Sequence, residues 1–290
     1  MNHLIAKADV LIEALPYIQS FRNEIIVVKF GGSAMEDKAN HDGILLDITF
    51  MECVGMLPVI VHGGGKSISR AMEAAGLKAV FVNGLRVTDE AAIKVVEEVI
   101  RNRVNAGIVA TLTAQKAKAR LVDGTTVFQV IKRTAIDPAT GKNIDWGYVG
   151  EVVAVDAAPI RAFLESGIIP VITPLGRSAD GKTYNLNADD AAAAAAKALK
   201  ARKLAVLSDV PGLLRDRHDE TTLISHLRIC EVEDLMVRGI IDGGMLPKIR
   251  GCVEALAAGV KKIHIIDGRK SHSLLLEIFT DKGTGTEIIE

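Results

Sequence analysis

The chain has 290 residues, of which 49% are hydrophobic and 24% are charged, and its formal net charge is -1. Such an apolar, charge-balanced composition excludes a disordered chain, and it lacks the basic excess typical of nucleic-acid-binding proteins. A chain of this length forms one large domain or two smaller ones.

Signals for targeting, disulfides and structural metal are weak. Cys53, Cys230 and Cys252 are odd in number and widely spaced, which argues against a disulfide framework and a zinc site. No apolar run approaches the roughly 18 residues that a membrane span needs. Lys7 and Asp9 interrupt the first apolar stretch, unlike a signal peptide. We expect a cytoplasmic protein without a structural metal.

The first residues predict an amphipathic helix that Pro16 limits or bends. Its apolar stripe repeats with helical spacing and consists of Leu4, Ile5, Ala8, Leu11, Ile12 and Leu15. Because residues 1–20 lie outside the pattern that follows, the stripe either packs on its own domain or meets another subunit. We take residues 1–20 as an oligomerisation helix.

Short apolar strands then alternate with helices. Strands are predicted at 24–30, 57–61, 167–172, 203–207 and 261–266, and helices at 42–54, 88–104, 157–166, 187–200 and 245–258. This alternation predicts an α/β fold, an open and mainly parallel sheet sandwiched by helices. The Thr- and Gly-rich stretch 121–155 and the segment 178–184 predict β-hairpins.

Two glycine-rich turns follow the first two strands. Lys29 precedes Gly31-Gly32, and Gly63-Gly64-Gly65 leads into a helix. The second turn is no P-loop, because Ile60 occupies the position of the required first glycine. Bare backbone amides at a strand-to-helix junction nevertheless favour a carboxylate or phosphate.

Further polar residues stand at the other strand ends and helix starts. Arg86 precedes a helix that begins near Asp89 and is able to bind a carboxylate bidentately. The remaining candidates are Asn185 and Asp189 near a helix start, Ser208 and Asp209 after a strand, and Lys248 in a helix that opens with glycines.

Together these groups suit phosphoryl transfer between two anions, a reaction that depends on positioning and charge stabilisation. The sequence offers no serine or cysteine nucleophile and no defined histidine–carboxylate pair. A carboxylate acceptor is already ionised at neutral pH, so it needs no general base.

In this order and spacing, the motifs resemble the amino-acid kinase family, and within it the arginine-inhibited hexameric branch that acts on N-acetyl-L-glutamate. The matching segments are 27–35, 61–65, 83–89, 147–152, 184–189, 207–213 and 243–249, with 13–18, 264–269 and 274–280 typical of that branch.

The resemblance implies that ATP, with Mg²⁺ carried by its phosphates, phosphorylates the side-chain carboxylate of N-acetyl-L-glutamate. It implies an acyl-substrate lobe over 21–200 and a nucleotide lobe over 201–290. Its catalytic residues would be Lys29, Lys248 and Asp189, with Gly31, Gly32, Ser208 and Asp209 on the nucleotide side. Its acceptor-binding residues would be Gly64, Gly65, Arg86 and Asn185.

The branch also implies regulation and assembly. Arginine would bind near Tyr17, Lys203, Glu277 and Gly283, and the chain would form a homo-oligomer, expected to be a hexamer, with a PII-type signalling protein as a further expected partner. Two other hypotheses remain open at this point. One is a kinase for another amino dicarboxylate, such as aspartate or an aminoadipate derivative, and the other is a non-catalytic arginine sensor.

Overall fold

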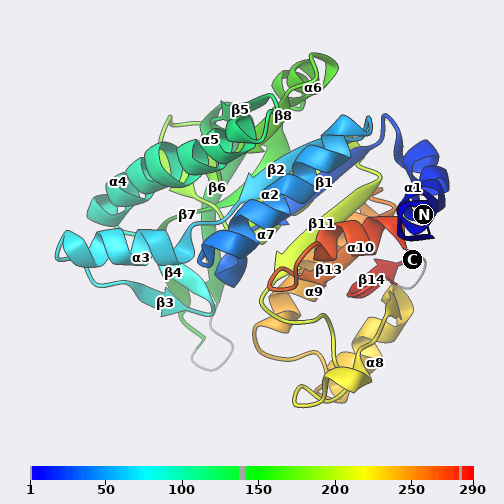
Figure 1. Ribbon diagram of the computed structural model, residues 1–290. Helices are drawn as coiled ribbons and strands as arrows, with labels where there is room; N and C mark the ends of the chain where they lie inside the picture. Colours follow the sequence, from blue (N-terminus) through cyan, green and yellow to red (C-terminus); the bar gives the residue numbers. More distant parts are fainter. Residues whose placement is uncertain (1, 137–140, 281–282) are drawn as a thin grey trace.

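The computed structural model describes residues 2–136, 141–280 and 283–290, and over these residues one twisted sheet runs through the molecule (Figure 1). Its eight strands lie in the order β12-β14-β13-β11-β1-β2-β8-β5. Their bounds are β1 Ile25–Phe30, β2 Leu57–His62, β5 Ala119–Val122, β8 Ile169–Ile172, β11 Lys203–Ser208, β12 His226–Arg228, β13 Lys262–Asp267 and β14 Thr286–Ile289.

The six strands from β13 to β5 pair in parallel, whereas β14 pairs antiparallel with β13 and parallel with β12, so β14 and β12 run opposite to the other six. The prediction of a mainly parallel sheet is therefore confirmed, and each of the five predicted strands is present within a few residues of its expected bounds. Because parallel strands end at one edge, the turns after β1, β2, β5, β8, β11 and β13 gather there.

Helices cover both faces of this sheet, as the continuous apolar strands require. One face is covered by α2 Lys38–Cys53, α5 Ala106–Ala114 and α10 Ser273–Phe279, and the other by α6 Ala158–Glu165, α7 Ala188–Leu199 and α9 Met245–Ala257. Two apolar cores result, and β1 contributes alternate residues to them: Val27 to the core under α7, and Ile26 and Val28 to the core under α2. The short helices α3 Gly65–Ala74 and α8 Val232–Val237 lie at opposite ends of the molecule (Figure 1).

The predicted helix 88–104 is longer and less regular than expected. It begins as α4 Glu90–Glu98, with the Asp89 side chain capping it, and continues through a π-helical segment, Val99–Asn105, into α5. The sequence does not reveal the π-helical turn, because Ile100, Val104 and Ile108 recur every four residues, a spacing that ordinary amphipathic helices also use.

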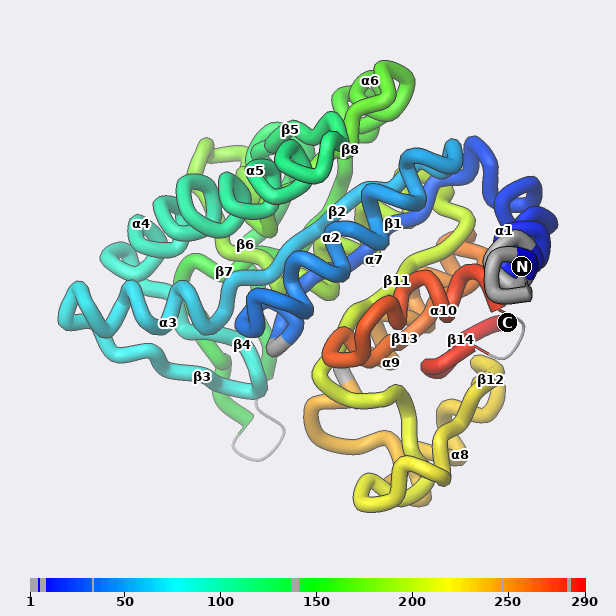
Figure 2. The backbone as a smooth tube through the Cα atoms, viewed as in Figure 1, coloured from blue at the N-terminus to red at the C-terminus, as the bar shows by residue number. Residues whose placement is uncertain are grey.

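The N-terminal helix α1 spans Asn2–Phe21 and does not end at Pro16. Pro16 is exposed, so water can satisfy the carbonyl that loses its helical partner. Figure 2 shows α1 beside α10 near the C-terminal end, and Tyr17 packs against Phe279 there. Of the predicted stripe, Ile5, Leu11, Ile12 and Leu15 are exposed, while Leu4 and Ala8 lie outside the side chains that are described.

Both predicted hairpin regions are confirmed. The strands β6 Phe128–Ile136 and β7 Asn143–Val155 pair antiparallel, and with β9 Leu175–Arg177 and β10 Thr183–Asn185 they close into a small barrel. A further hairpin, β3 Val80–Val82 with β4 Leu85–Val87, was not predicted. No helix among the described residues is long and apolar enough to cross a membrane.

Gly124, in the turn after β5, lies in a tightly packed part of the edge at which the parallel strands end. A Cβ at Gly124 would lie 2.2 Å from the carbonyl oxygens of both Thr173 and Leu175, which are backbone atoms that cannot move away independently. We predict that Gly124→Ala lowers the free energy of unfolding by about 1–3 kcal/mol or more, the scale of overpacking a core.

The matched control is Gly107→Ala in α5, where a Cβ meets nothing within 4 Å. Alanine there should raise the free energy of unfolding by about 0.5–1 kcal/mol, since glycine weakens a helix interior. Chemical denaturation of both variants checks the pair, and equal effects would contradict the packing described here.

Candidate active site

One carboxylate joins two lysines from distant parts of the chain. Asp189, in the first turn of α7, lies 3.0 Å from Lys29 Nζ through Oδ1 and 3.0 Å from Lys248 Nζ through Oδ2. Lys29 is near the end of β1, and Lys248 is in the first turns of α9. The three residues that the sequence singled out as catalytic candidates are therefore brought together.

Asp189 is held in its ionised form. Burial alone would raise the pKa of its carboxyl group, but the positive charges of Lys29 and Lys248 outweigh burial and lower that pKa to about 2. Lys29 is itself buried, with 9% of its side chain exposed, whereas 23% of the Lys248 side chain is exposed. The carboxylate thus fixes two ammonium groups side by side, with one net positive charge left over.

The two glycine turns lie against each other beside Lys29. Gly63 N–H donates to Phe30 O (2.7 Å), and a Cβ on Gly31 would lie 3.5 Å from the Gly63 Cα and 3.4 Å from Lys29 Nζ. Gly32 has a φ of +69°, a conformation that glycine adopts without strain. Gly64 caps α3, so the amides around it are free helix-start donors.

Arg86, on β4, is a buried guanidinium directed at the second glycine turn. Its Nη2 donates to Gly65 O (2.7 Å) and Ser69 Oγ (2.9 Å), and the group lies 4.6 Å above the ring of Phe81. Burial lowers the pKa of Arg86. In the described parts of the chain no carboxylate pairs with Arg86, so its charge is available to an anionic ligand.

The two asparagines before α7 have different surroundings. Asn187 caps the helix, because its side chain accepts from Asp189 N (3.0 Å). Asn185 is on β10, next to β7, and the described residues offer its side chain no hydrogen bond. Of the two asparagines, Asn187 is therefore the capping residue, and Asn185 stays a predicted ligand-binding residue.

Ser208 and Asp209 lie at the end of β11, on the C-terminal side of the sheet. Ser208 Oγ lies 3.4 Å from Asp209 Oδ1, and Ser208 O accepts from Gly268 N after β13. Neither residue contacts the Lys29–Asp189–Lys248 cluster. Both lie at the edge where the parallel strands end, after β11, which is the neighbour of β1.

The four predicted effector residues line one cavity of about 420 Å³, on the side of the sheet near α1. Tyr17, Lys203, Glu277 and Gly283 all contribute to its wall. Burial lowers the pKa of Lys203 to about 8, and its ammonium lies 4.8 Å from the Phe21 ring. Glu277 accepts from the N–H groups of Thr284 and Gly285 and pairs with His264 Nδ1 (2.7 Å).

No defined histidine–carboxylate pair was predicted, and the structure corrects this. His264 pairs with Glu277, and His272 Nδ1 lies 2.6 Å from the buried Asp47. Two more pairs are His226–Glu287 and the sequence neighbours His41–Asp42. Apart from His41–Asp42, each pair joins residues of different elements, so no spacing rule finds them, and none of the pairs includes a residue of the lysine cluster.

The residues that hold the Arg86 hairpin were also missed. Trp146 Nε1 donates to Val82 O (2.9 Å), and Thr88 exchanges hydrogen bonds with Trp146 O and Tyr148 N. Gly147, with a φ of +71°, lies so close to Thr88 O that a Cβ would come within 2.2 Å. A lone tryptophan in a hairpin was the only signal, and it does not reveal its partner.

A sequence profile of the amino acid kinase family matches residues 24–267 of this chain. Acetylglutamate kinase of Heliobacterium modesticaldum is 45% identical, with all of both chains covered, and acetylglutamate kinase of Thermoanaerobacter pseudethanolicus is 48% identical over 98% of this chain and 93% of its own. The chain therefore belongs to the amino acid kinase family, and it is a kinase.

A solved structure of N-acetylglutamate synthase from Neisseria gonorrhoeae, with coenzyme A and N-acetyl-glutamate, superposes with a TM-score of 0.84 at 30% identity. The match covers 98% of this chain but only 63% of the synthase. The same synthase with coenzyme A and L-arginine gives a TM-score of 0.80 at 29% identity, over 97% of this chain and 65% of that one.

The lowered pKa of Asp189 predicts an acid-sensitive contribution to stability. Because the folded pKa lies below the unfolded value of 3.8, the contribution is fully present above about pH 4 and is lost as the pH falls toward 2. The difference in free energy of unfolding between the wild type and Asp189→Asn should therefore shrink as the pH falls from about 5 to about 2.

Urea denaturation at fixed ionic strength measures this difference. Glu254→Gln is the control, because Glu254 is exposed on α9 and forms no ion pair within the described residues. A difference for Asp189→Asn that stays constant with pH would contradict the ion-pair geometry.

Proposed function

We propose that this chain transfers the γ-phosphoryl group of ATP to the side-chain carboxylate of N-acetyl-L-glutamate, forming an acyl phosphate in arginine biosynthesis. The single observation that carries the proposal is that two lysines lie beside two glycine turns, each 3.0 Å from a different oxygen of Asp189. The acetylglutamate kinases that match its full length support this acceptor.

The residues of the site act on two anions, the phosphates of ATP and the carboxylate of the acceptor. Lys29 and Lys248 stabilise the charge on the transferring phosphoryl group, and Asp189 keeps their ammonium groups in place. The amides of Gly31 and Gly32 assist on the nucleotide side, and those of Gly64 and Gly65 receive the reacting carboxylate. Arg86 and Asn185 bind the rest of the acceptor.

No proton has to be removed from this acceptor, because its carboxylate is ionised at neutral pH. The oxygen attacks the γ-phosphorus, the bond to the β–γ bridging oxygen breaks, and ADP leaves with that oxygen. Mg²⁺ enters with the ATP phosphates as part of the substrate. Ser208 and Asp209 stand at the nucleotide part of the edge, within a nucleotide lobe of residues 201–290 that faces an acyl-substrate lobe of residues 21–200.

The first prediction from this assignment concerns the lysines. Lys29→Ala and Lys248→Ala should each lower kcat by about 10²–10³ or more, because each removes a donor used mainly in the transition state. A hydroxamate assay with ATP and N-acetyl-L-glutamate measures the rates.

Lys197→Ala is the control, since Lys197 is on the same helix as Asp189 but exposed. A loss confined to KM would contradict the role given to the lysines. A wild-type enzyme that phosphorylates aspartate or an aminoadipate derivative but not N-acetyl-L-glutamate would contradict the acceptor.

We further propose that arginine inhibits the enzyme from the cavity lined by Tyr17, Lys203, Glu277 and Gly283. The cavity has both signs of charge that the ligand needs: Lys203 and Lys262 suit its carboxylate, and Glu277 and Glu287 suit its guanidinium. The complex of the related synthase with L-arginine supports an effector of this kind in the fold.

Assembly is proposed on the same side of the molecule. The exposed apolar residues Ile5, Leu11, Ile12 and Leu15 form a stripe along α1 that is typical of a subunit contact, and we propose a hexamer in which α1 helices meet. A PII-type signalling protein as partner and a cytoplasmic location stay predictions.

Glu277→Gln should weaken inhibition by arginine at least tenfold while leaving the uninhibited kcat within about twofold, because the cavity is separate from the lysine cluster (about 1.4 kcal/mol per tenfold). Removing residues 1–20 should weaken inhibition as well and reduce the assembled mass in light scattering. Lys261→Met, at an exposed position before β13, is the control. Unchanged inhibition in Glu277→Gln would contradict the effector site, and an unchanged mass would contradict the role of α1.

A further inference from the structure

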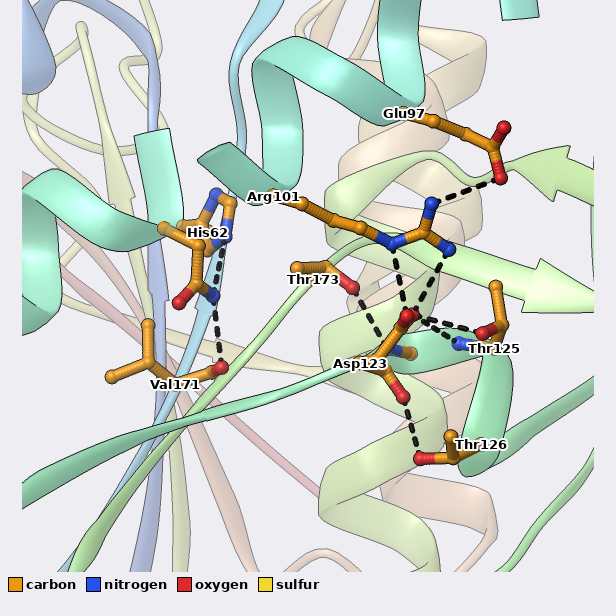
Figure 3. Close-up of polar contacts among 10 residues, drawn as sticks. His62, Glu97, Arg101, Asp123, Thr125, Thr126, Val171 and Thr173 are labelled. Atoms are coloured by element: carbon orange, nitrogen blue, oxygen red, sulfur yellow. Dashed lines mark hydrogen bonds and ion pairs between the residues drawn. The ribbon is translucent and has the colours of Figure 1, made fainter. Parts of the chain in front are cut away.

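A buried histidine lies at the start of the second glycine turn, next to the π-helical segment. His62 is the last residue of β2 and is fully buried, and its Nδ1 lies 2.8 Å from Gly63 O. Its Nε2 lies 3.0 Å from Nδ2 of Asn105, the last residue of the π-helical segment. Asn105 is also fully buried, and its Nδ2 donates to Val171 O of β8 at 2.9 Å (Figure 3).

These contacts permit a single arrangement of hydrogens. A carbonyl oxygen only accepts, so His62 Nδ1 must carry the proton that points to Gly63 O. The Asn105 amide nitrogen must face Val171 O, so its second hydrogen points to His62 Nε2, which therefore accepts. Burial lowers the pKa of His62 to about 4, in keeping with a neutral ring.

The π-helical segment is anchored on its other side. Arg101 Nε donates to Asp123 (2.9 Å), and Arg101 Nη1 donates to Glu97 (3.0 Å). Asp123 in turn accepts from the hydroxyl and N–H of Thr125, in the turn after β5 (Figure 3). The wider turn between these anchors carries Ile100 and Val104 against Gly64 and Asn105 against His62.

The consequence concerns one peptide group. The Gly63–Gly64 bond is trans, so the Gly63 carbonyl and the Gly64 N–H point in opposite directions. Since His62 holds the carbonyl on its own side, the Gly64 N–H points away from His62. Gly63 itself adjoins Gly31, which lies beside Lys29. Hydrogen bonds from Gly63 N–H to Phe30 O and from Ile68 N–H to Gly64 O hold the neighbouring peptides. The glycines on both sides leave the Gly63–Gly64 peptide itself a wide range of rotation.

We propose that His62 and Asn105 are positioning residues that hold the Gly63–Gly64 peptide in the orientation in which the Gly64 N–H faces the reacting carboxylate. This inference rests on the proposed function, because it assumes that this amide serves the transition state. His62 acts here as a fixed donor to the backbone and exchanges no proton with the substrate.

Four variants test the proposal in the full chain. His62→Leu and Asn105→Leu should lower kcat about 10–100-fold, less than the loss of a whole donor, and change the KM for ATP less than about threefold. His62→Asn places an amide N–H where Nδ1 stands, so it should restore kcat to within about fivefold of the wild type. Leu112→Ala, a buried change in α5 that does not touch the turn, should reduce stability without lowering kcat.

A second measurement is independent of turnover. Nitrogen NMR of the imidazole should show Nδ1 protonated and Nε2 bare from about pH 6 to 8, the range in which a histidine with an ordinary pKa titrates. A cationic ring, the opposite tautomer, or wild-type kcat in His62→Leu and Asn105→Leu would overturn the proposal. A wild-type chain inactive with N-acetyl-L-glutamate would overturn the proposed function instead, and the tautomer would then decide whether the peptide is held as described.

Discussion

The interaction on which the rest of the site depends is the contact of one carboxylate with two ammonium groups. Lys29 and Lys248 would repel each other at this separation if Asp189 did not lie between them. Each of the three comes from a different element, β1, α9 and α7, so the sheet and the helices on one face must form before the cluster exists. The fold therefore fixes the charges before any substrate arrives, which is the condition for stabilising a transition state without reorganisation.

The surroundings of the cluster follow the same principle. Two turns of bare glycine amides lie against Lys29, and the second turn is bordered by a buried arginine that has no carboxylate partner among the described residues. Two anions repel each other in water, but they can approach each other where backbone amides and cationic side chains already point into the site. The cavity near α1, which we propose as the arginine site, is built differently, with carboxylates beside Lys203 that would suit a ligand carrying both signs of charge. The two sites are thus distinguished by their electrostatics as well as by their places on the sheet.

Much of the fold could be predicted from the sequence because the signals were local. The signals were the continuous apolar strands, the Asn187 cap and the glycine turns, each of which occupies a few consecutive residues. They were sufficient to predict the sheet and to place Lys29, Gly64 and Asp189 at strand ends and helix starts. What could not be predicted depended on contacts across the chain. The pairs His62–Asn105 and His272–Asp47, and the tryptophan bond that holds the Arg86 hairpin, join residues that no spacing relates. The π-helical turn was not predicted for another reason: its buried residues recur every four positions, which ordinary amphipathic helices also do.

The most direct test of the account is a crystal structure with Mg²⁺, ADP, aluminium fluoride and N-acetyl-L-glutamate, in which the fluoride group stands in for the phosphoryl group in transfer. The account predicts that the Nζ atoms of Lys29 and Lys248 both lie within hydrogen-bond distance of that group, while Asp189 still contacts both. A structure in which either ammonium group turns toward solvent, away from the fluoride, would contradict it.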